Sequence, residues 1–283
     1  MIIIGEKINA TRKSVAKAIR SRDRTAIQQQ IENQDKAGAH FIDLNAGTGA
    51  GDENQEIQDM CWLIDIALET TDKKLSIDSA NPVIIRRAAE HINNRRPWLI
   101  NSVKNDDPIL EEILPIAAAH GASIIGLGMD ASGVPEKAEE RIAACREIYK
   151  KAEKTGISKE QLFFDPLVLP LSSNYNHGKI AIATLCGLKD EFPEIKTTMG
   201  VSNISFGLPK RARINAVFLF AALSQGLDAA ICDPTNERIR KAILLGELIA
   251  GKDKHCRSYT RAVRKGEFEK DPKKPNPDAK EVL

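Results

Sequence analysis

Short apolar runs alternate with longer segments of helical periodicity from the N-terminus to about residue 250. Eight of these runs are candidate strands: Ile2–Gly5, Phe41–Leu44, Leu75–Ile77, Trp98–Ile100, Ser123–Gly126, Leu162–Phe164, Thr197–Gly200 and Ala229–Ile231. Most are continuously apolar or β-rich, which is typical of strands that are covered on both faces. Eight strand–helix units in a chain of this length predict an α/β protein with a single (β/α)8 TIM barrel, which typically needs ~250 residues.

The segments between the runs have the apolar spacing of amphipathic helices. Two of them end at a glycine that suits the left-handed position after a helix, namely Gly38 and Gly121. The expected helices are Thr25–Ala37, Glu53–Glu69, a helix that begins at Pro82, Pro108–His120, Glu136–Lys154, Arg213–Ser224 and Asn236–Ala250. We see no linker among them and therefore expect one domain.

The character of the sequence changes after Gly251, where Lys, Asp and Pro become frequent. We expect residues 1–259 to form the barrel and residues 260–283 to form a polar, flexible C-terminal tail. The glycine-rich segment 47–51 reads Gly-Thr-Gly-Ala-Gly and lacks the spacing of a phosphate-binding loop. We interpret it as a flexible loop.

Composition limits the kinds of partner. A net charge of +2 and an aromatic content of 5% give no reason to expect nucleic acid or a membrane surface. The apolar start is cut short by Glu6 and Lys7, so it is too brief for a signal peptide or a membrane span. The five cysteines are scattered without a CxxC pair, which predicts neither a zinc site nor a disulfide framework and indicates a cytoplasmic protein.

Polar side chains follow the predicted strands. In the stretch Leu75–Pro82 a carboxylate, Asp78, stands where a buried strand ends, and Pro82 suits the first turn of the next helix. A helix-capping role is the alternative for Asp78 when this stretch is considered alone. The other strand ends repeat the arrangement with the residues Glu6, Lys7, Asn9, Asp43, Asn45, Asn101, Ser102, Asp165, Ser202 and Asn203.

In a parallel α/β barrel the carboxyl ends of the strands form the floor of the active site. Asn45, Asn81 and Ser102 are each explained as a cap or a loop residue. The coincidence of Asp78, Asn101, Asp165 and Asn203 at four strand ends instead predicts a binding site.

Carboxylates accept paired N–H groups, and amides both donate and accept, so such a set is suited to an edge that alternates donors and acceptors. The amino-pyrimidinone edge of a pterin is one example. Metal binding is the competing interpretation of several carboxylates, but their spacing matches no calcium loop and no histidine–carboxylate set.

Six motifs resemble those of the pterin-binding methyltransferases: Ile4–Asn9, Asp43–Asn45, Ile77–Ser79, Ile100–Ser102, Phe164–Leu167 and Gly200–Ser205. The resemblance runs from Ile2 to about Tyr259. Within that group the chain looks most like the methyltetrahydrofolate:corrinoid methyltransferases, relatives of the folate domain of cobalamin-dependent methionine synthase.

The resemblance implies that Asp78, Asn101 and Asp165 hold the pterin edge and that Asn203 faces N5, the nitrogen that carries the methyl group. Asn203 is thus the expected catalytic residue, with Asp78 and water as the proton route. The resemblance also places Arg211 near the site. We expect the motif residues Glu6, Asp43 and Ser202 to line it as well.

The substrate implied is tetrahydrofolate or 5-methyltetrahydrofolate, and the methyl partner is a corrinoid such as cobalamin. Because the chain shows no cobalamin-binding domain, the corrinoid is expected on a separate protein. The resemblance further suggests a homodimer. It leaves open the direction of transfer, the particular corrinoid protein, the proton source and the dimer surface. Some stand-alone members of the family have a glutamine at the position of Phe206, so a role of that glutamine cannot be carried over to this chain.

Two alternatives remain at the level of sequence. A dihydropteroate synthase-like enzyme needs a diphosphate site, but the lysine signature expected near its seventh strand is replaced here by Gly200–Asn203. A non-catalytic folate-binding barrel would use the edge residues and would have no need of Asn203.

Overall fold

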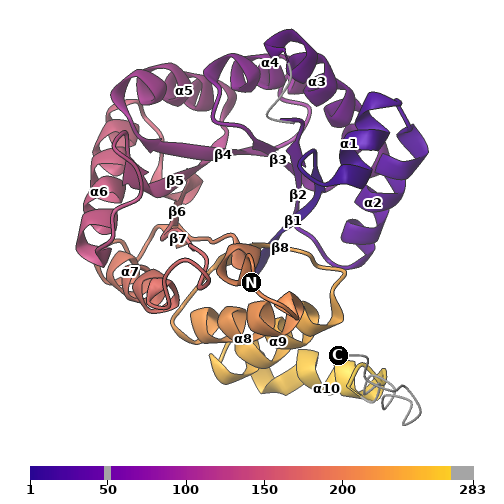
Figure 1. Ribbon diagram of the computed structural model, residues 1–283, viewed down its shortest axis with the longest axis vertical. Helices are drawn as coiled ribbons and strands as arrows, with labels where there is room; N and C mark the ends of the chain where they lie inside the picture. The colour runs from indigo at the N-terminus through magenta and orange to yellow at the C-terminus, as the bar shows by residue number, and fades with distance from the viewer. Residues whose placement is uncertain (48–51, 269–283) are drawn as a thin grey trace.

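The computed structural model describes residues 1–47 and 52–268, and its strands form the predicted barrel with helices around it (Figure 1). All paired strands are parallel, and the sheet order β7-β6-β5-β4-β3-β2-β1-β8 places consecutive strands side by side. The strands are β1 Ile2–Asn9, β2 Phe41–Asn45, β3 Lys74–Asp78, β4 Trp98–Asn105, β5 Ser123–Asp130, β6 Leu162–Asp165, β7 Lys196–Thr197 and β8 Ala229–Cys232.

The helices follow the strands in order around the outside of the barrel (Figure 1). They are α1 Lys13–Arg20, α2 Arg24–Lys36, α3 Glu53–Thr70, α4 Pro82–Ile92, α5 Asp107–His120, α6 Ala138–Lys154, α7 His177–Glu191, α8 Arg211–Ser224, α9 Glu237–Ile249 and α10 Arg257–Arg264. The expected helices are confirmed within about two residues at each end. Helices α1, α7 and α10 were not anticipated from the sequence.

The seventh strand differs from the prediction. The apolar run suggested Thr197–Gly200, whereas β7 comprises only Lys196–Thr197. After Thr198 the backbone leaves β6 and turns toward β8, where the Ile231 N–H donates to the Met199 carbonyl over 2.9 Å and Gly200 forms an isolated bridge with Ile231. The segment then enters the 3₁₀ helix η2 (Val201–Ser205). This short contact closes the barrel between β7 and β8.

The interior of the barrel contains a layer of buried apolar side chains from six strands: Ile4, Phe41, Leu99, Ile125, Phe163 and Ala229. Successive side chains of a strand point to opposite faces, so the residue two positions later points into the barrel again, one layer higher. Glu6, Asp43 and Asn101 stand two positions after members of this layer. The same spacing relates Phe163 to Asp165. The strand period thus carries these polar side chains to the carboxyl end of the barrel.

A second and larger core fills the space between the strands and the helices. It includes fully buried side chains of the strands, such as Ile42, Ile77 and Ile100, and of the helices, such as Leu63 and Ile85. Burying a side chain of this kind stabilises a fold by ~1.5–3 kcal/mol. The sheet is therefore apolar on both faces along most of its length, and polar residues collect at its end.

The C-terminal part of the described chain continues beyond the predicted barrel boundary at residue 259. Helix α10 lies beside α9 (Figure 1), and Glu267 forms an ion pair with Arg240 of α9. The flexible loop predicted at 47–51 lies, apart from Gly47, outside the described residues, as does residue 269 onward of the predicted tail. Within the described ranges, no helix combines the length and the apolar character that crossing a membrane requires.

Candidate active site

A cavity of about 400 Å³ lies at the carboxyl end of the strands. All the site residues predicted from the sequence line it except Arg211: Glu6, Asp43, Asp78, Asn101, Asp165, Ser202 and Asn203. The structure thus brings together side chains from β1, β2, β3, β4 and β6 and from η2. The apolar part of the wall comes from Leu127, Leu167, Val168 and Ile231.

Asp43 is the buried centre of one polar cluster. Its Oδ1 accepts hydrogen bonds from Ser76 Oγ at 2.5 Å and from Asn101 Nδ2 at 3.2 Å. Burial and the negative charge of nearby Asp78 raise the pKa of Asp43 well above its ordinary value. The bond from Asn101 also fixes how the Asn101 amide is turned, so that its carbonyl oxygen is left for another donor.

Asp78 does not cap the following helix, because Asn81 does so by accepting from the Val83 N–H at 2.9 Å. The capping interpretation of Asn81 is therefore confirmed. Asp78 instead accepts a bond from Asn45 Nδ2 at 3.0 Å. Burial raises the pKa of Asp78, and the bond from Asn45 opposes that shift. Asn45, interpreted from the sequence as a cap or loop residue, is a positioning residue for Asp78.

Asp165 ends β6 and is 6% exposed. Burial raises its pKa to about 7, against bonds from the backbone N–H groups of Leu167 and Gly200 and the charge of Arg141. The Arg141 side chain is itself buried and donates to the Pro166 carbonyl at 3.0 Å and the Leu167 carbonyl at 2.7 Å. Arg141 thereby holds the turn whose Leu167 N–H reaches Asp165 over 2.8 Å.

Glu6 connects β1 to η2. Its carboxylate accepts from Ser202 Oγ at 3.2 Å and lies 3.4 Å from the Arg12 guanidinium. Burial raises the pKa of Glu6 to about 7, and Arg12 and the bond from Ser202 oppose this shift. Burial thus brings the pKa of both Glu6 and Asp165 close to neutral pH, where each is able to accept or donate a proton.

Asn203 lies in η2 with an exposed side chain, and within the described residues that side chain has no hydrogen-bond partner. A β-carbon added to Gly200 would lie 3.1 Å from Asn203 Nδ2, so the amide rests over the Gly200 backbone. Arg211 braces η2 by donating to the Ser202 carbonyl at 2.7 Å and to Ser205 Oγ at 3.1 Å. Arg211 lines a neighbouring cavity and not the one that holds the Asp residues.

Sequence reasoning missed several residues of the site. Asn45 was named only as a cap or loop residue, although it stands two positions after Asp43 in β2 and so lies on the same face. Arg12 and Thr11, which also line the cavity, come from the turn between β1 and α1, where no periodicity marks them. No three or more His, Cys, Asp and Glu side chains in residues 1–47 and 52–268 are grouped so that they could hold a metal ion.

The mouth of this (β/α)8 barrel gathers three Asp, one Glu and three Asn side chains, a set of donors and acceptors suited to the edge of a small heterocycle. Residues 5–233 match the family described as "Pterin binding enzyme", and the chain belongs to this family.

Its relatives agree with this assignment. The chain is 33% identical over 271 residues to "Methylcorrinoid:tetrahydrofolate methyltransferase" of Eubacterium limosum, which covers 95% of this chain and 98% of that protein. It is 28% identical over 244 residues to "Methionine synthase" of Mycobacterium tuberculosis, and this match covers 82% of this chain but 20% of that protein. The resemblance stated from the motifs is thus confirmed.

Solved structures with the same fold include dihydropteroate synthases. The enzyme of Stenotrophomonas maltophilia with imidazole has a TM-score of 0.68 at 15% identity, covering 88% of this chain and 92% of that one. The Yersinia pestis enzyme with a pterine–sulfa conjugate has a TM-score of 0.65 at 18% identity, covering 87% and 92%. At such identities the likeness concerns the fold alone.

Proposed function

We propose that the protein transfers a methyl group between N5 of tetrahydrofolate and the cobalt of a corrinoid carried by a separate protein. One observation carries the proposal: Asp78, Asn101, Asp165 and Asn203 line a single cavity at the carboxyl ends of the strands. The similarity over nearly the whole chain to a methylcorrinoid:tetrahydrofolate methyltransferase supports it. The name of that relative gives the methylcorrinoid as donor, so transfer onto tetrahydrofolate is the direction to test first.

Asp78, Asn101 and Asp165 would bind the amino-pyrimidinone edge of the pterin. The carboxylates accept N–H groups, and the Asn101 carbonyl, left free by the bond from its amide to Asp43, accepts another. Glu6, Asp43 and Ser202 support this set: Asp43 orients Asn101, and Ser202 is bonded to Glu6. The leucine, valine and isoleucine side chains of the wall would contact the pterin faces.

Asn203 would face N5. When the bond from N5 to the methyl group breaks, its electron pair stays on N5 and the cobalt of the reduced corrinoid takes the methyl group. The nitrogen then needs a proton or a hydrogen-bond donor. An amide that has no hydrogen-bond partner among the described residues is free to supply such a bond, and it can accept from a protonated N5 in the reverse direction. Stabilisation of this kind grows along the reaction coordinate, as catalysis requires.

Three groups near the cavity could exchange the proton with N5 through water. Asp78 is the residue that the sequence predicts for this role, and its pKa is raised by burial. The pKa values of Glu6 and Asp165, both about 7, suit the same task at neutral pH. Glu6 also accepts a hydrogen bond from Ser202, which precedes Asn203 in the chain.

A single-turnover assay tests the proposal. Purified protein is mixed with methylated corrinoid and tetrahydrofolate, or with reduced corrinoid and 5-methyltetrahydrofolate, and the visible spectrum of the corrinoid is followed. Spectral conversion that depends on the protein is the expected result. Tight folate binding with an unchanged spectrum for every corrinoid would identify a non-catalytic folate-binding barrel. Product formed from aminobenzoate and pterin diphosphate would instead identify a dihydropteroate synthase-like enzyme.

The proposal also covers the oligomeric state of the protein and its cellular compartment. A homodimer with both barrel mouths free for corrinoid proteins is expected from the family resemblance, and the protein is expected to work in the cytoplasm. Static light scattering at micromolar concentration checks the first statement, and a monomeric mass would contradict it.

A further inference from the structure

The side chain of Arg141 on α6 is completely buried, which is unusual for a cation because removing a charge from water is costly. All of its hydrogen bonds go to backbone carbonyl oxygens. Nε donates to Pro135 at 2.9 Å, and Nη1 donates to Pro166 at 3.0 Å and to Leu167 at 2.7 Å. The other terminal nitrogen, Nη2, is buried without a hydrogen-bond partner among the described residues. A cation kept buried in this way indicates a role beyond packing.

Two glycines of β5 allow α6 to approach closely enough to place Arg141 there. A β-carbon added to Gly128 would lie 3.0 Å from Arg141 Cβ, and one added to Gly126 would lie 3.1 Å from Ile148 Cγ2. Carbon atoms pack favourably at ~3.5–4.0 Å, so a larger residue at either position would push α6 outward. The sequence Gly126-Leu127-Gly128 thus directs Leu127 into the barrel and leaves the outer face of β5 free for the helix that carries Arg141.

The turn that Arg141 binds has a strained backbone and forms part of the cavity wall. Leu167 has a φ of +60°, a left-handed conformation that is unfavourable for a residue with a β-carbon. In this conformation its N–H donates to Asp165 Oδ1 at 2.8 Å, and Leu167 lines the cavity together with Asp165. The bond from Arg141 to the Leu167 carbonyl therefore holds the turn in the shape that orients Asp165.

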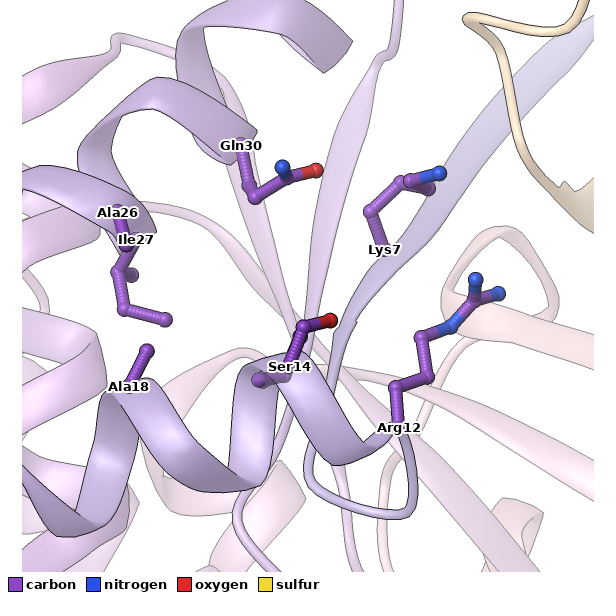
Figure 2. Close-up of a pocket in the computed structure, with 8 residues that line it drawn as sticks. Lys7, Arg12, Ser14, Ala18, Ala26, Ile27 and Gln30 are labelled. Atoms are coloured by element: carbon purple, nitrogen blue, oxygen red, sulfur yellow. The ribbon is translucent and has the colours of Figure 1, made fainter.

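Arg141 differs from other cations near the mouth of the barrel, which have carboxylate partners. Lys7 and Arg12 lie together on one side of the pocket between α1 and α2 (Figure 2). Lys7 pairs with Asp233 at 3.0 Å, and Arg12 lies 3.4 Å from Glu6. Among the residues that the structure describes, Arg141 forms no such ion pair. Its positive charge is therefore not neutralised by direct contact.

The carboxylate on which this charge acts is Asp165. Burial raises the pKa of Asp165 to about 7, and the charge of Arg141 opposes this shift. The next ionisable group along α6, the thiol of Cys145, is buried and stays uncharged because burial raises its pKa. The other charged groups of the cavity come from β1, β2, β3 and the turn after β1, across the barrel from β6 (Figure 1): Glu6, Asp43, Asp78 and Arg12.

We infer that Arg141 is a positioning residue for pterin binding, which fixes the turn after β6 so that Asp165 faces the cavity and provides the counter-charge of that carboxylate. The inference rests on the proposed function, in which ionised Asp165 accepts N–H groups of the pterin edge. Arg141 is not among the residues that line the cavity, so it acts on the pterin only through Asp165 and the turn.

The two contributions of Arg141 depend on pH in different ways. Loss of the bonds to the carbonyl oxygens weakens folate binding at every pH, because the turn and Asp165 are then less well oriented. Loss of the charge raises the pKa of Asp165, so it weakens binding at pH values where the carboxyl becomes protonated and has no effect at higher pH.

Calorimetric titration with 5-methyltetrahydrofolate from pH 6 to pH 9 separates the two contributions. Arg141→Met keeps the length of the side chain and removes the charge and the donors, whereas Arg141→Lys keeps the charge without the planar set of donors. Both variants should bind about threefold or more weakly at pH 9, because hydrogen bonds to the turn are lost. In Arg141→Met the midpoint of the pH profile should also rise by about one unit, the lower end of what a nearby opposite charge produces. In Arg141→Lys it should stay near that of wild type.

Two further measurements distinguish positioning from a general structural role. In the methyl-transfer assay, the loss in Arg141→Met should appear in KM for folate more than in the single-turnover rate at saturating folate. In the free protein, NMR of ¹³C-labelled aspartate carboxyl groups follows the titration of Asp165, with the signal assigned by Asp165→Asn. Its midpoint should rise in Arg141→Met, and this measurement needs no ligand.

Arg146→Met is the matched control. Arg146 lies on the same helix, but it is partly exposed and pairs with Glu191 at 2.6 Å. Its loss removes the same charge and should leave both the affinity and the midpoint unchanged. Urea denaturation verifies that each variant is folded. If Arg141→Met does not fold, Gly128→Ala repeats the test of the turn, because the added β-carbon displaces Arg141 without removing its charge.

The outcomes separate the inference from the proposed function. Wild-type affinity and midpoint in Arg141→Met would overturn the inference and leave the proposed function intact, as would lowered stability with unchanged folate binding, which would make Arg141 purely structural. The same changes in Arg146→Met would also overturn it. Failure of the wild-type protein to bind folate would overturn the proposed function, and the NMR titration would still decide whether Arg141 is the counter-charge of Asp165.

Discussion

The Ser202 hydroxyl donates a hydrogen bond of 3.2 Å to the carboxylate of Glu6, which lies 196 positions earlier in the chain. The bond joins η2 to β1 at the place where the barrel closes with little regular pairing, through the bridge between Gly200 and Ile231. Glu6 therefore has two functions in the fold. It forms part of the closure of the barrel, and it forms part of the wall of both the active-site cavity and the neighbouring cavity that Arg211 lines.

Because of this position, Glu6 should make stability depend on pH. Its pKa is about 7 in the folded protein, against an ordinary value of 4.5 for a solvated glutamate, so the folded protein holds the proton more tightly than the unfolded chain does. Stability should be highest below pH 4.5, decline as the pH rises to about 7, and stay constant above that. A difference of this size corresponds to roughly 3 kcal/mol. In Glu6→Gln this part of the decline should be absent.

Urea denaturation at pH 5 and pH 8 measures the effect, and the stability of Glu6→Gln relative to wild type should rise between these two values. The exposed Glu111→Gln on α5 is the control and should follow the wild type. The same pH dependence in wild type and Glu6→Gln would show that the Glu6 carboxyl is not perturbed by folding.

The sequence predicted the barrel well because each strand is a short apolar run with a polar residue at its end. The prediction misplaced the end of β7. Met199 and Val201 are apolar whether the chain continues along β6 or turns toward β8, so only tertiary contacts decide where the strand ends. Asp78 and Asp165 end β3 and β6 as the sequence predicted, whereas Asn101 lies inside β4, which continues to Asn105. Arg12 was not predictable, because a turn brings it to the cavity.

Two further features of the structure come only from three-dimensional contacts. Asn45 was interpreted as a cap or loop residue, yet its amide bonds to Asp78 from the neighbouring strand. Asn215 stands in a helical run between apolar residues, and nothing in the run indicates that its carbonyl oxygen is buried without a partner. Hydrogen bonds between neighbouring strands, and buried atoms without a partner, depend on side-chain packing, which the periodicity of the sequence does not show.

Asp165→Ala should weaken folate binding by about 1–3 kcal/mol, the usual cost of leaving buried donors without their acceptor. The reason is that Asp165 is the buried carboxylate at the end of β6 and is proposed to accept from the pterin edge. Calorimetric titration with 5-methyltetrahydrofolate measures the loss. An unchanged affinity would remove Asp165 from the pterin site.

The protonation of Asp165 should also appear in the pH dependence of binding. Only its ionised form accepts two N–H groups, and its pKa in the free protein is about 7. Folate affinity should therefore fall as the pH is lowered below about 7, by up to ~10-fold per unit, and level off above it. In Asp165→Asn, which keeps an acceptor for the Leu167 N–H, the profile should be flatter. Parallel profiles for the two proteins would assign the titration to another group.

Gly200→Ala should alter the reaction more than the fold. The added β-carbon would meet Asn203 Nδ2 at 3.1 Å, and since the Asn203 side chain is exposed it can move aside by a few tenths of an ångström. The backbone of Gly200, with φ −75°, accepts an alanine without strain. We expect thermal stability close to that of wild type and slower methyl transfer. A fully active Gly200→Ala would mean that the position of the amide is not critical.

Asn203→Ala separates catalysis from binding. If the Asn203 amide stabilises charge that develops at N5, its loss should lower the single-turnover rate by roughly 10²–10³, by analogy with donors aimed at an oxyanion. The folate affinity should change much less, because Asn203 lies outside the set assigned to the pterin edge. An ordinary edge contact would instead affect mainly KM. The rate is read from the visible spectrum of the corrinoid, and the affinity comes from calorimetry of the same preparation. Equal losses in rate and in affinity would make Asn203 a binding residue, and the protonation of N5 would then depend on Asp78, Glu6 or Asp165 through water.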